Sequence, residues 1–229
     1  MATTKAALLD VDGTLVDSND AHARAWVRAL AELGHEVAYE RVRALIGKGG
    51  DKLLRETLGV ESDSREGKKI TARRSALFEA VYLPKLRAFL GARPLLVAMK
   101  ARGLKLTVAT SAKRDEVAAI LEVASLGDLI AEGATSSDAK DSKPDPDIVV
   151  AALRSAGCDP SEAIMLGDTP YDVEAATRAG VTAVALRCGG WSDDALAGAA
   201  AIYDDPRDLL AHLGSSPFEV ARMAMTARP

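Results

Sequence analysis

Short apolar runs alternate with helical patterns along the 229-residue chain, and this alternation limits the folds open to it. The runs cover residues 6–10, 104–110, 163–168 and 181–186. Short, nearly continuous apolar runs are typical of parallel strands, which are buried on both faces. One helical pattern has Thr169 as its predicted N-cap, Pro170 as its first residue and Gly180 at its end; another has Asp145 as its predicted N-cap. The alternation predicts an α/β fold with a doubly wound parallel sheet.

Residues 17–90 interrupt this alternation, because they contain helix signals and no convincing strand. Helices are predicted near residues 18–34, 39–47, 51–59 and 64–90. Pro84 is expected to kink or end the last of them. An all-helical block after the first strand predicts a cap inserted over the edge of the sheet. We therefore expect an α/β catalytic core of residues 1–16 and 91–229 and a helical cap of residues 17–90.

The composition argues against several kinds of partner. A net charge of -4 offers no basic area for nucleic acid or an anionic membrane, and an aromatic content of 4% is too low for a base-stacking platform. No apolar run approaches the roughly 20 residues of a membrane span, and the N-terminal apolar stretch is too short for a signal peptide. Cys158 and Cys188 lack CxxC spacing and nearby histidines, which predicts ordinary thiols in a reducing, cytoplasmic location.

Polar side chains stand where several predicted strands end. The set comprises Asp10, Asp12, Thr110, Ser111, Asp168 and Asp172, together with Lys143 ahead of a predicted helix. Ligands of open parallel sheets bind beyond the carboxyl ends of the strands, so we expect these groups to converge there. Clustered carboxylates without histidine or cysteine favour a hard cation, and Mg²⁺ is the usual one where phosphate is bound.

This set predicts phosphoryl-transfer chemistry. A carboxylate attacks a dianionic phosphate only when positive charge offsets the repulsion, and Mg²⁺ with Lys143 would supply that charge. Ser111 and loop amides would hold the phosphoryl oxygens. Asp10 would attack phosphorus to form an aspartyl-phosphate, and Asp12 would protonate the leaving oxygen and later activate water.

Four motifs in this order resemble those of the haloacid dehalogenase superfamily of phosphotransferases. They read DVDGT, TS, SKPDPD and GDTPYD, and the resemblance covers about residues 5–213. The helical block resembles the cap of the phosphoglycolate phosphatase and β-phosphoglucomutase-like branch. The resemblance implies a Rossmann-like core. Aspartate at position 12 disfavours carbon–halogen cleavage, because the dehalogenases that named the superfamily differ there.

The resemblance also implies a role for each motif residue. Asp10 would be the nucleophile and a metal ligand, and Asp12 would be the acid/base and offer its backbone carbonyl to the metal. Ser111, helped by Thr110, would bind the phosphoryl group, and Lys143 would steady both nucleophile and phosphate. The remaining metal-site residues would be Asp168, as a direct ligand, and Asp172, through hydrogen bonds or water.

The helical block contributes weaker candidates. His22 in HARAW resembles a family pattern in which this histidine lies near the substrate, although a partly buried helix residue fits as well. Lys48 in IGKGGDK lies beside glycines whose amides suit a substrate anion, and a flexible turn with a solvated lysine is the alternative. The RCGGW segment at residues 187–191 either edges the site or simply turns.

The favoured function is Mg²⁺-dependent hydrolysis of a small phosphorylated metabolite, such as phosphoglycolate or a sugar phosphate. Intramolecular transfer, as in β-phosphoglucomutase, would use the same core residues. Phosphonate cleavage ranks lower and would require Lys48 to form a Schiff base. A non-catalytic protein that binds a phosphometabolite would have no need of Asp12. The sequence leaves the particular ester and the oligomeric state, monomer or dimer, open.

Overall fold

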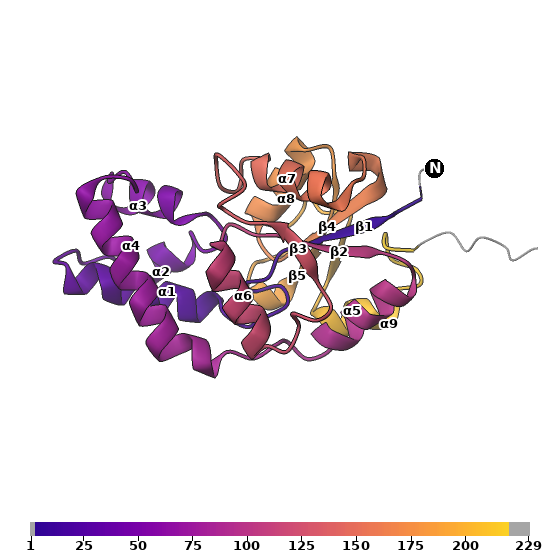
Figure 1. Cartoon of the computed structure of the whole chain (residues 1–229), viewed down its shortest axis with the longest axis horizontal. Coiled ribbons are helices and arrows are strands. Elements are labelled where there is room, and N and C mark those ends of the chain that lie inside the picture. Colours follow the sequence, from indigo (N-terminus) through magenta and orange to yellow (C-terminus); the bar gives the residue numbers. More distant parts are fainter. Residues whose placement is uncertain (1–2, 220–229) are drawn as a thin grey trace, which may run out of the picture.

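The computed structural model describes residues 3–219 and contains a six-stranded parallel sheet in the order β3-β2-β1-β4-β5-β6. The strands are β1 (Ala6–Leu9), β2 (Lys105–Ala109), β3 (Ala131–Ala134), β4 (Ala163–Gly167), β5 (Thr182–Leu186) and β6 (Ala201–Tyr203). The predicted doubly wound α/β fold is confirmed (Figure 1). Residues 1–2 and 220–229 of the predicted core lie outside the described residues.

Two strands were not predicted from the sequence. β3 (AEGA) and β6 (AIY) form the two edges of the sheet, and each is too short or too polar to produce an apolar run. An edge strand has one neighbour, so its burial demands fewer apolar residues than a central strand does. The four predicted strands are the four central ones.

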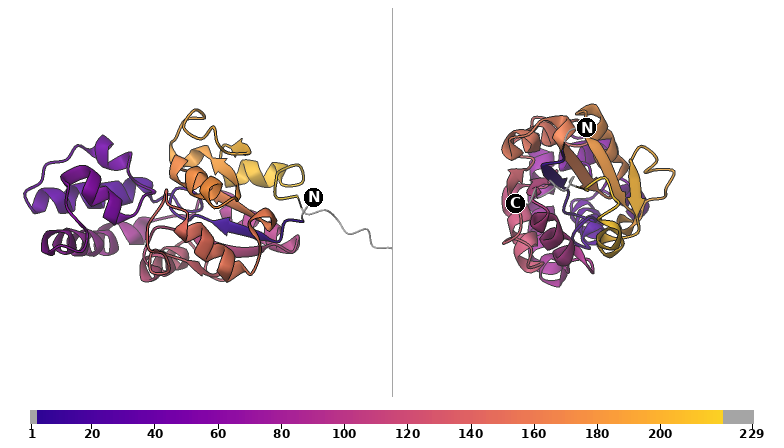
Figure 2. Two further views of the ribbon diagram at one scale, coloured as in Figure 1. Left: turned by 90° about the horizontal axis from the view of Figure 1, so that it is seen from above. Right: turned by 90° about the vertical axis from the view of Figure 1, so that its right-hand side faces the viewer.

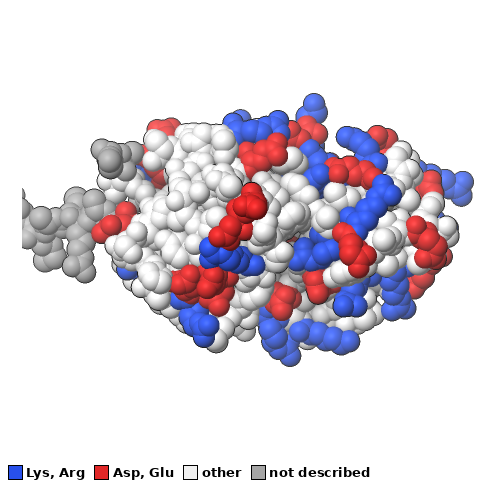
Figure 3. All heavy atoms as spheres, turned by 180° about the vertical axis from the view of Figure 1, so that it is seen from behind, with Lys and Arg blue, Asp and Glu red and all other residues white. Residues whose placement is uncertain are grey.

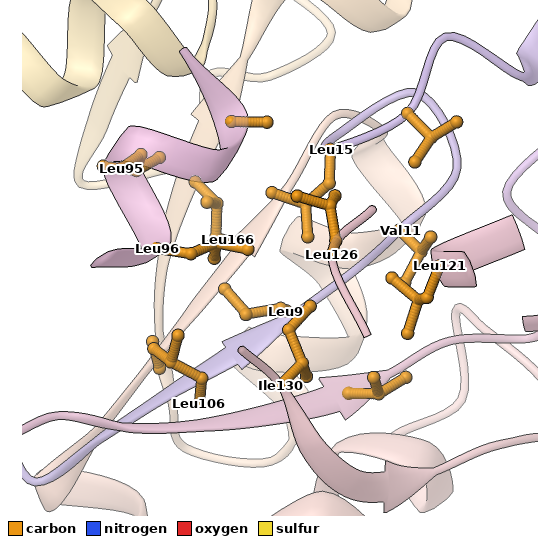
Figure 4. Packing of buried hydrophobic residues seen from close by; sticks show 14 of the residues in the cluster. Leu9, Val11, Leu15, Leu95, Leu96, Leu106, Leu121, Leu126, Ile130 and Leu166 are labelled. Carbon is orange, nitrogen blue, oxygen red and sulfur yellow. The ribbon is translucent and has the colours of Figure 1, made fainter. Parts of the chain in front are cut away.

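Helices cover both faces of the sheet. On one face lie α5 (Ala92–Ala101), α6 (Arg114–Val123) and α9 (Pro206–His212), and on the other lie α7 (Asp147–Ala156) and α8 (Pro170–Arg178). Alternate residues of β1 enter the two hydrophobic clusters, with Leu9 on the α5 side and Leu8 on the α7 side. Figure 4 shows Leu9 packed among side chains of the first cluster, including Leu106 and Leu166.

Of the two predicted helix N-caps, one is confirmed and the other is wrong. Thr169 caps α8, which begins at Pro170, as predicted. The prediction for α7 was wrong, because the helix begins at Asp147 and Pro146 occupies the N-cap position. Asp145 instead forms ion pairs with Lys52 of the helical block and Arg178 of α8, so these two cations engage its carboxylate.

The helices between β1 and α5 form a separate helical lobe beside the sheet (Figures 1 and 2). It contains α1 (Asn19–Glu32), α2 (Tyr39–Arg43), α3 (Gly50–Leu58) and α4 (Arg65–Leu77). The lobe has its own hydrophobic cluster, which includes Trp26, Leu54 and Ile70. A single helix was predicted for residues 64–90, but α4 ends at Leu77. A π-helical turn (Phe78–Tyr82) and a 3₁₀ turn (Leu83–Lys85) that contains Pro84 follow it.

The two chain segments that join the lobe to the sheet lie side by side. The amide of Asp17 donates to the carbonyl of Arg87 at 3.0 Å, and that of Phe89 donates to Leu15 at 2.9 Å. Both segments therefore leave the sheet as one short paired connection. The boundaries of a cap at residues 17 and 90 remain a prediction that fits this arrangement.

The surface carries charges of both signs. On the face shown in Figure 3, basic and acidic side chains lie interspersed, without a broad area of one sign. Within residues 3–219, no helix combines the length and apolar character that crossing a bilayer requires.

Candidate active site

The carboxyl ends of β1 and β4 bring Asp10 and Asp168 together. These strands are hydrogen-bonded neighbours, and the amide of Asp10 donates to the carbonyl of Leu166 at 2.9 Å. Asp172, in the first turn of α8, joins the pair across Gly167. A Cβ on Gly167 would lie 2.4 Å from the Cβ of Asp172, so only glycine allows this close approach.

Lys143 is the cation at the centre of this group. Its Nζ donates to Asp10 Oδ1 and to Asp172 Oδ1, each at 2.6 Å, and the residue is fully buried. Burial acts to lower the pKa of Lys143, but the two carboxylates outweigh it and raise the pKa above its usual value. The other oxygen of Asp172 accepts hydrogen bonds from the amide and the hydroxyl of Thr169. These bonds hold the Asp172 carboxylate in the orientation in which its Oδ1 faces Lys143.

Asp10, Asp168 and Asp172 form a buried carboxylate cluster, with one oxygen of each lying within 4.8 Å of the others. Burial and the neighbouring Asp172 raise the pKa of Asp168 to about 7, and burial with the surrounding carboxylates raises the pKa of Asp10 well above its ordinary value. The hydroxyl of Thr14 lies between them, 2.9 Å from Asp168 Oδ1 and 3.2 Å from Asp10 Oδ2. The donors are all oxygens, as a hard divalent cation requires, and a cation would relieve their repulsion.

Asp12 is held apart from this cluster by hydrogen bonds. Its Oδ1 accepts from the Ser18 hydroxyl at 2.5 Å and from His22 Nε2 at 2.7 Å. Burial acts to raise the pKa of Asp12, but the contacts with His22 and Ser18 and the charge of Arg74 lower it overall. His22 Nδ1 faces Arg74, which can only donate, so His22 must donate to Asp12 through Nε2–H.

Arg74 and Glu116 were missed in the sequence. Arg74, in α4, is buried and joins His22 to Glu116 of α6, so a chain of contacts runs from Asp12 through the helical lobe to the core. Its guanidinium also lies 4.9 Å from the centre of the Phe78 ring. One sequence signal was available, because Arg74 follows Ile70 by four residues and so lies on the buried stripe of its helix.

The phosphate-binding candidates adjoin the same centre. Ser111 Oγ accepts a hydrogen bond from the amide of Lys143 at 3.3 Å, and Thr110 Oγ1 accepts from the amide of Ala112 at 3.2 Å. Both residues line a cavity of about 490 Å³ together with Asp10 and Asp12. A cavity of this volume is suited to a small ligand.

Side chains from the helical lobe complete the wall of this cavity, among them His22 and Lys48. Lys48 is neither free nor fully solvated, because its Nζ pairs with Glu56 at 2.7 Å and lies 4.8 Å from the centre of the Tyr171 ring. The amide of Gly49 donates to Ser142 Oγ at 3.2 Å and is also engaged. The geometry brings His22 to the acid/base candidate and Lys48 to the cavity wall.

The fold and this site define a hydrolase with a Rossmann-like α/β core. The sequence model of the haloacid dehalogenase-like hydrolases matches residues 7–186, so the chain belongs to this family, as its motifs predicted. A phosphoglycolate phosphatase from Rhodospirillum rubrum is 35% identical over 213 residues, which cover 88% of this chain and 87% of that protein.

Solved structures agree with this assignment. A hydrolase from Pseudomonas syringae has a TM-score of 0.85 and 32% identity, with 93% of this chain and 99% of that chain covered. A Bacteroides vulgatus protein, described provisionally as a β-phosphoglucomutase, has a TM-score of 0.81 and 26% identity, with coverage of 93% and 88%. The fold is thus shared by a hydrolase and by a protein described as a mutase.

Proposed function

We propose that this protein hydrolyses a small phosphate monoester, with Mg²⁺, through an aspartyl-phosphate on Asp10. The observation that carries the proposal is the position of Asp10. Of the three clustered carboxylates, Asp10 alone also lines the cavity, and its Oδ1 accepts a hydrogen bond from the buried ammonium of Lys143. It therefore stands between the cation-binding oxygens and the space open to a substrate.

Each residue has a distinct task in this mechanism. A carboxylate oxygen of Asp10 forms a bond to phosphorus while the ester P–O bond breaks. Asp12, whose pKa is low in the free protein, must take up a proton when the negatively charged ester binds, and it gives this proton to the departing oxygen. Asp12 then removes a proton from the water that attacks the aspartyl-phosphate, which releases phosphate and restores Asp10. Mg²⁺, held by Asp10, Asp168 and the backbone carbonyl of Asp12 with support from Asp172, would neutralise charge on the phosphoryl oxygens.

The site favours hydrolysis of a small ester over phosphonate cleavage and over binding without catalysis. The relatives named phosphoglycolate phosphatase suggest a substrate of that size, and the helical lobe limits the cavity to about 490 Å³. Phosphonate cleavage would require an uncommitted Lys48, whereas its nitrogen is paired with Glu56. A protein that only binds a phosphometabolite would gain nothing from the hydrogen bonds that hold Asp12.

The test is phosphate release from a panel of small phosphate esters that includes phosphoglycolate and several sugar phosphates. Each ester is assayed with Mg²⁺ and with a chelator. Release that requires Mg²⁺ supports the proposal, and the order of the rates indicates the leaving group. Folded protein that binds an ester yet releases no phosphate would contradict it, and conversion of a sugar phosphate to its isomer would support the mutase instead.

Mg²⁺ is expected to stabilise the protein, and more strongly at about pH 8 than at about pH 5. Because the pKa of Asp168 rises from 3.8 to about 7 on folding, the metal-free folded state loses stability as the pH rises through this window. Mg²⁺ and protons compete for the clustered carboxylates, so Mg²⁺ binds best at high pH, where few protons are bound. Thermal denaturation should show a Tm increase of about 3 to 10 °C at saturating Mg²⁺. Equal increases at both pH values would contradict this account.

Arg74→Met is expected to lower kcat by about 10- to 100-fold, because Arg74 orients the His22 ring that donates to Asp12. The matched control is Arg73→Met, since Arg73 is exposed and pairs with Glu32. We expect the control to keep kcat within about twofold. Steady-state kinetics on both variants measure the difference. A lowered affinity with unchanged kcat in Arg74→Met would show that Arg74 contacts substrate and does not act through His22.

A further inference from the structure

Asn19 has no role in the mechanism above, yet it contacts the carboxylate cluster. It is the first residue of α1 and is only 3% exposed. Its Nδ2 donates to Asp168 Oδ2 at 2.9 Å and to the carbonyl of Gly189 at 3.3 Å. Both neighbours are acceptors, so the nitrogen, and not the oxygen, of the amide must face them.

Both oxygens of Asp168 therefore accept a hydrogen bond. Thr14 Oγ1 donates to Oδ1 at 2.9 Å, while Asn19 holds Oδ2. One donor comes from the loop after β1 and the other from the helical lobe. With both oxygens bonded, the carboxylate cannot rotate without breaking a buried hydrogen bond.

Glycines leave the space for this contact. Gly13 has a φ of 77°, and a Cβ there would lie 2.0 Å from Asn19 Nδ2. A Cβ on Gly189, in the RCGGW segment, would lie 1.8 Å from Asp168 Oδ2. The RCGGW segment therefore edges the carboxylate cluster and is more than a turn.

The composition supplies a second, independent observation. Asn19 is the single asparagine in all 229 residues, and the chain contains no glutamine. The only carboxamide side chain of the protein is thus buried against a cation-binding candidate.

The Oδ1 of Asn19 has no hydrogen-bond partner among residues 3–219, and a buried acceptor without a donor is costly. A water molecule would supply that donor.

We propose that Asn19 is a positioning residue of the divalent-cation site, which holds Asp168 through Nδ2 and accepts a hydrogen bond from cation-bound water through Oδ1. This inference rests on the proposed function, since it takes Asp168 as a ligand of Mg²⁺. Groups that orient metal ligands commonly change metal affinity by about 10- to 100-fold when they are removed.

The first test uses the unmodified protein. Because the chain has a single carboxamide, its ¹H–¹⁵N spectrum contains one side-chain NH₂ pair, provided that no tag adds another. Addition of Mg²⁺ should shift this pair, with the same midpoint as Mg²⁺ binding measured by calorimetry. A pair that stays in place while calorimetry records Mg²⁺ binding would overturn the inference.

The second test compares Mg²⁺ affinity in Asn19→Ala and Asn19→Ser, the latter being well tolerated at a helix start. Both should weaken Mg²⁺ binding by about 10- to 100-fold, while kcat at saturating Mg²⁺ stays within a few-fold of wild type. Tyr171→Phe is the control, because it removes a hydrogen bond between the core and the helical lobe without touching Asp168. The control should keep wild-type Mg²⁺ affinity. Wild-type affinity in both folded Asn19 variants would overturn the inference.

The outcomes separate this inference from the proposed function. Failure of the wild-type protein to bind Mg²⁺ would refute the metal-dependent mechanism itself. Normal Mg²⁺-dependent phosphate release, combined with an unshifted NH₂ pair, would refute the role of Asn19 alone.

Discussion

Replacement of Asp10 by asparagine is expected to reduce phosphate release by about 10⁴- to 10⁶-fold. The amide has the shape of the carboxylate but does not attack phosphorus, so the covalent step is lost. The variant should remain folded, because burial and neighbouring carboxylates already disfavour the charged form of Asp10, and an asparagine oxygen still accepts from Lys143. Phosphate release measures the loss, and circular dichroism checks the fold.

The control for this variant is Asp128→Asn. Asp128 is an exposed residue that pairs with Arg93, away from the carboxylate cluster, and its replacement should leave turnover unchanged within about twofold. An Asp10→Asn variant that retained more than a few per cent of wild-type turnover would show that another group attacks phosphorus.

Replacement of Lys143 by methionine is expected to remove turnover and to lower the free energy of unfolding by about 3 to 5 kcal/mol. The fully buried ammonium is paired with both Asp10 and Asp172, so its loss leaves two buried carboxylates without this countercharge. Urea denaturation, in the presence of chelator, measures the effect without compensation by metal.

Two further variants make this second prediction specific. Lys5→Met removes a lysine from an exposed ion pair with Glu162, and it should change the free energy of unfolding by less than about 1 kcal/mol. The double variant Lys143→Met/Asp172→Asn removes one of the stranded charges, so it should regain part of the stability and none of the activity. Wild-type stability in Lys143→Met would mean that the buried pairs do not hold the site together.

The sequence predicted those features that have a local cause. The central strands β1, β2, β4 and β5 are apolar because both faces are buried, and their ends carry the motif residues. The edge strands β3 and β6 carry no such run and were missed. The end of α4 at Leu77 was not predicted either, since a π-helical turn that starts at Phe78 leaves no residue pattern of its own.

Some residues of the candidate site could likewise be predicted from the sequence, and others could not. Asp10 and Asp168 could be placed together, because neighbouring parallel strands end at one edge of the sheet. Asn19, Arg74 and Glu116 could not, because their roles arise from contacts between the helical lobe and the core. Asn19, for example, meets Asp168 across 149 positions of sequence. Only the packed structure brings such side chains together.

The most direct test of the central claim is a search for the phosphoryl group on Asp10 itself. The enzyme is mixed with Mg²⁺ and an ester that it hydrolyses, and the reaction is quenched in acid within one turnover. The protein is then digested, and the mass of the peptide that contains Asp10 is measured by mass spectrometry. We expect a fraction of this peptide to carry one added phosphoryl group, and none to do so in Asp10→Asn. Rapid phosphate release with no modified peptide at any quench time would contradict an aspartyl-phosphate mechanism and would point to direct attack by water.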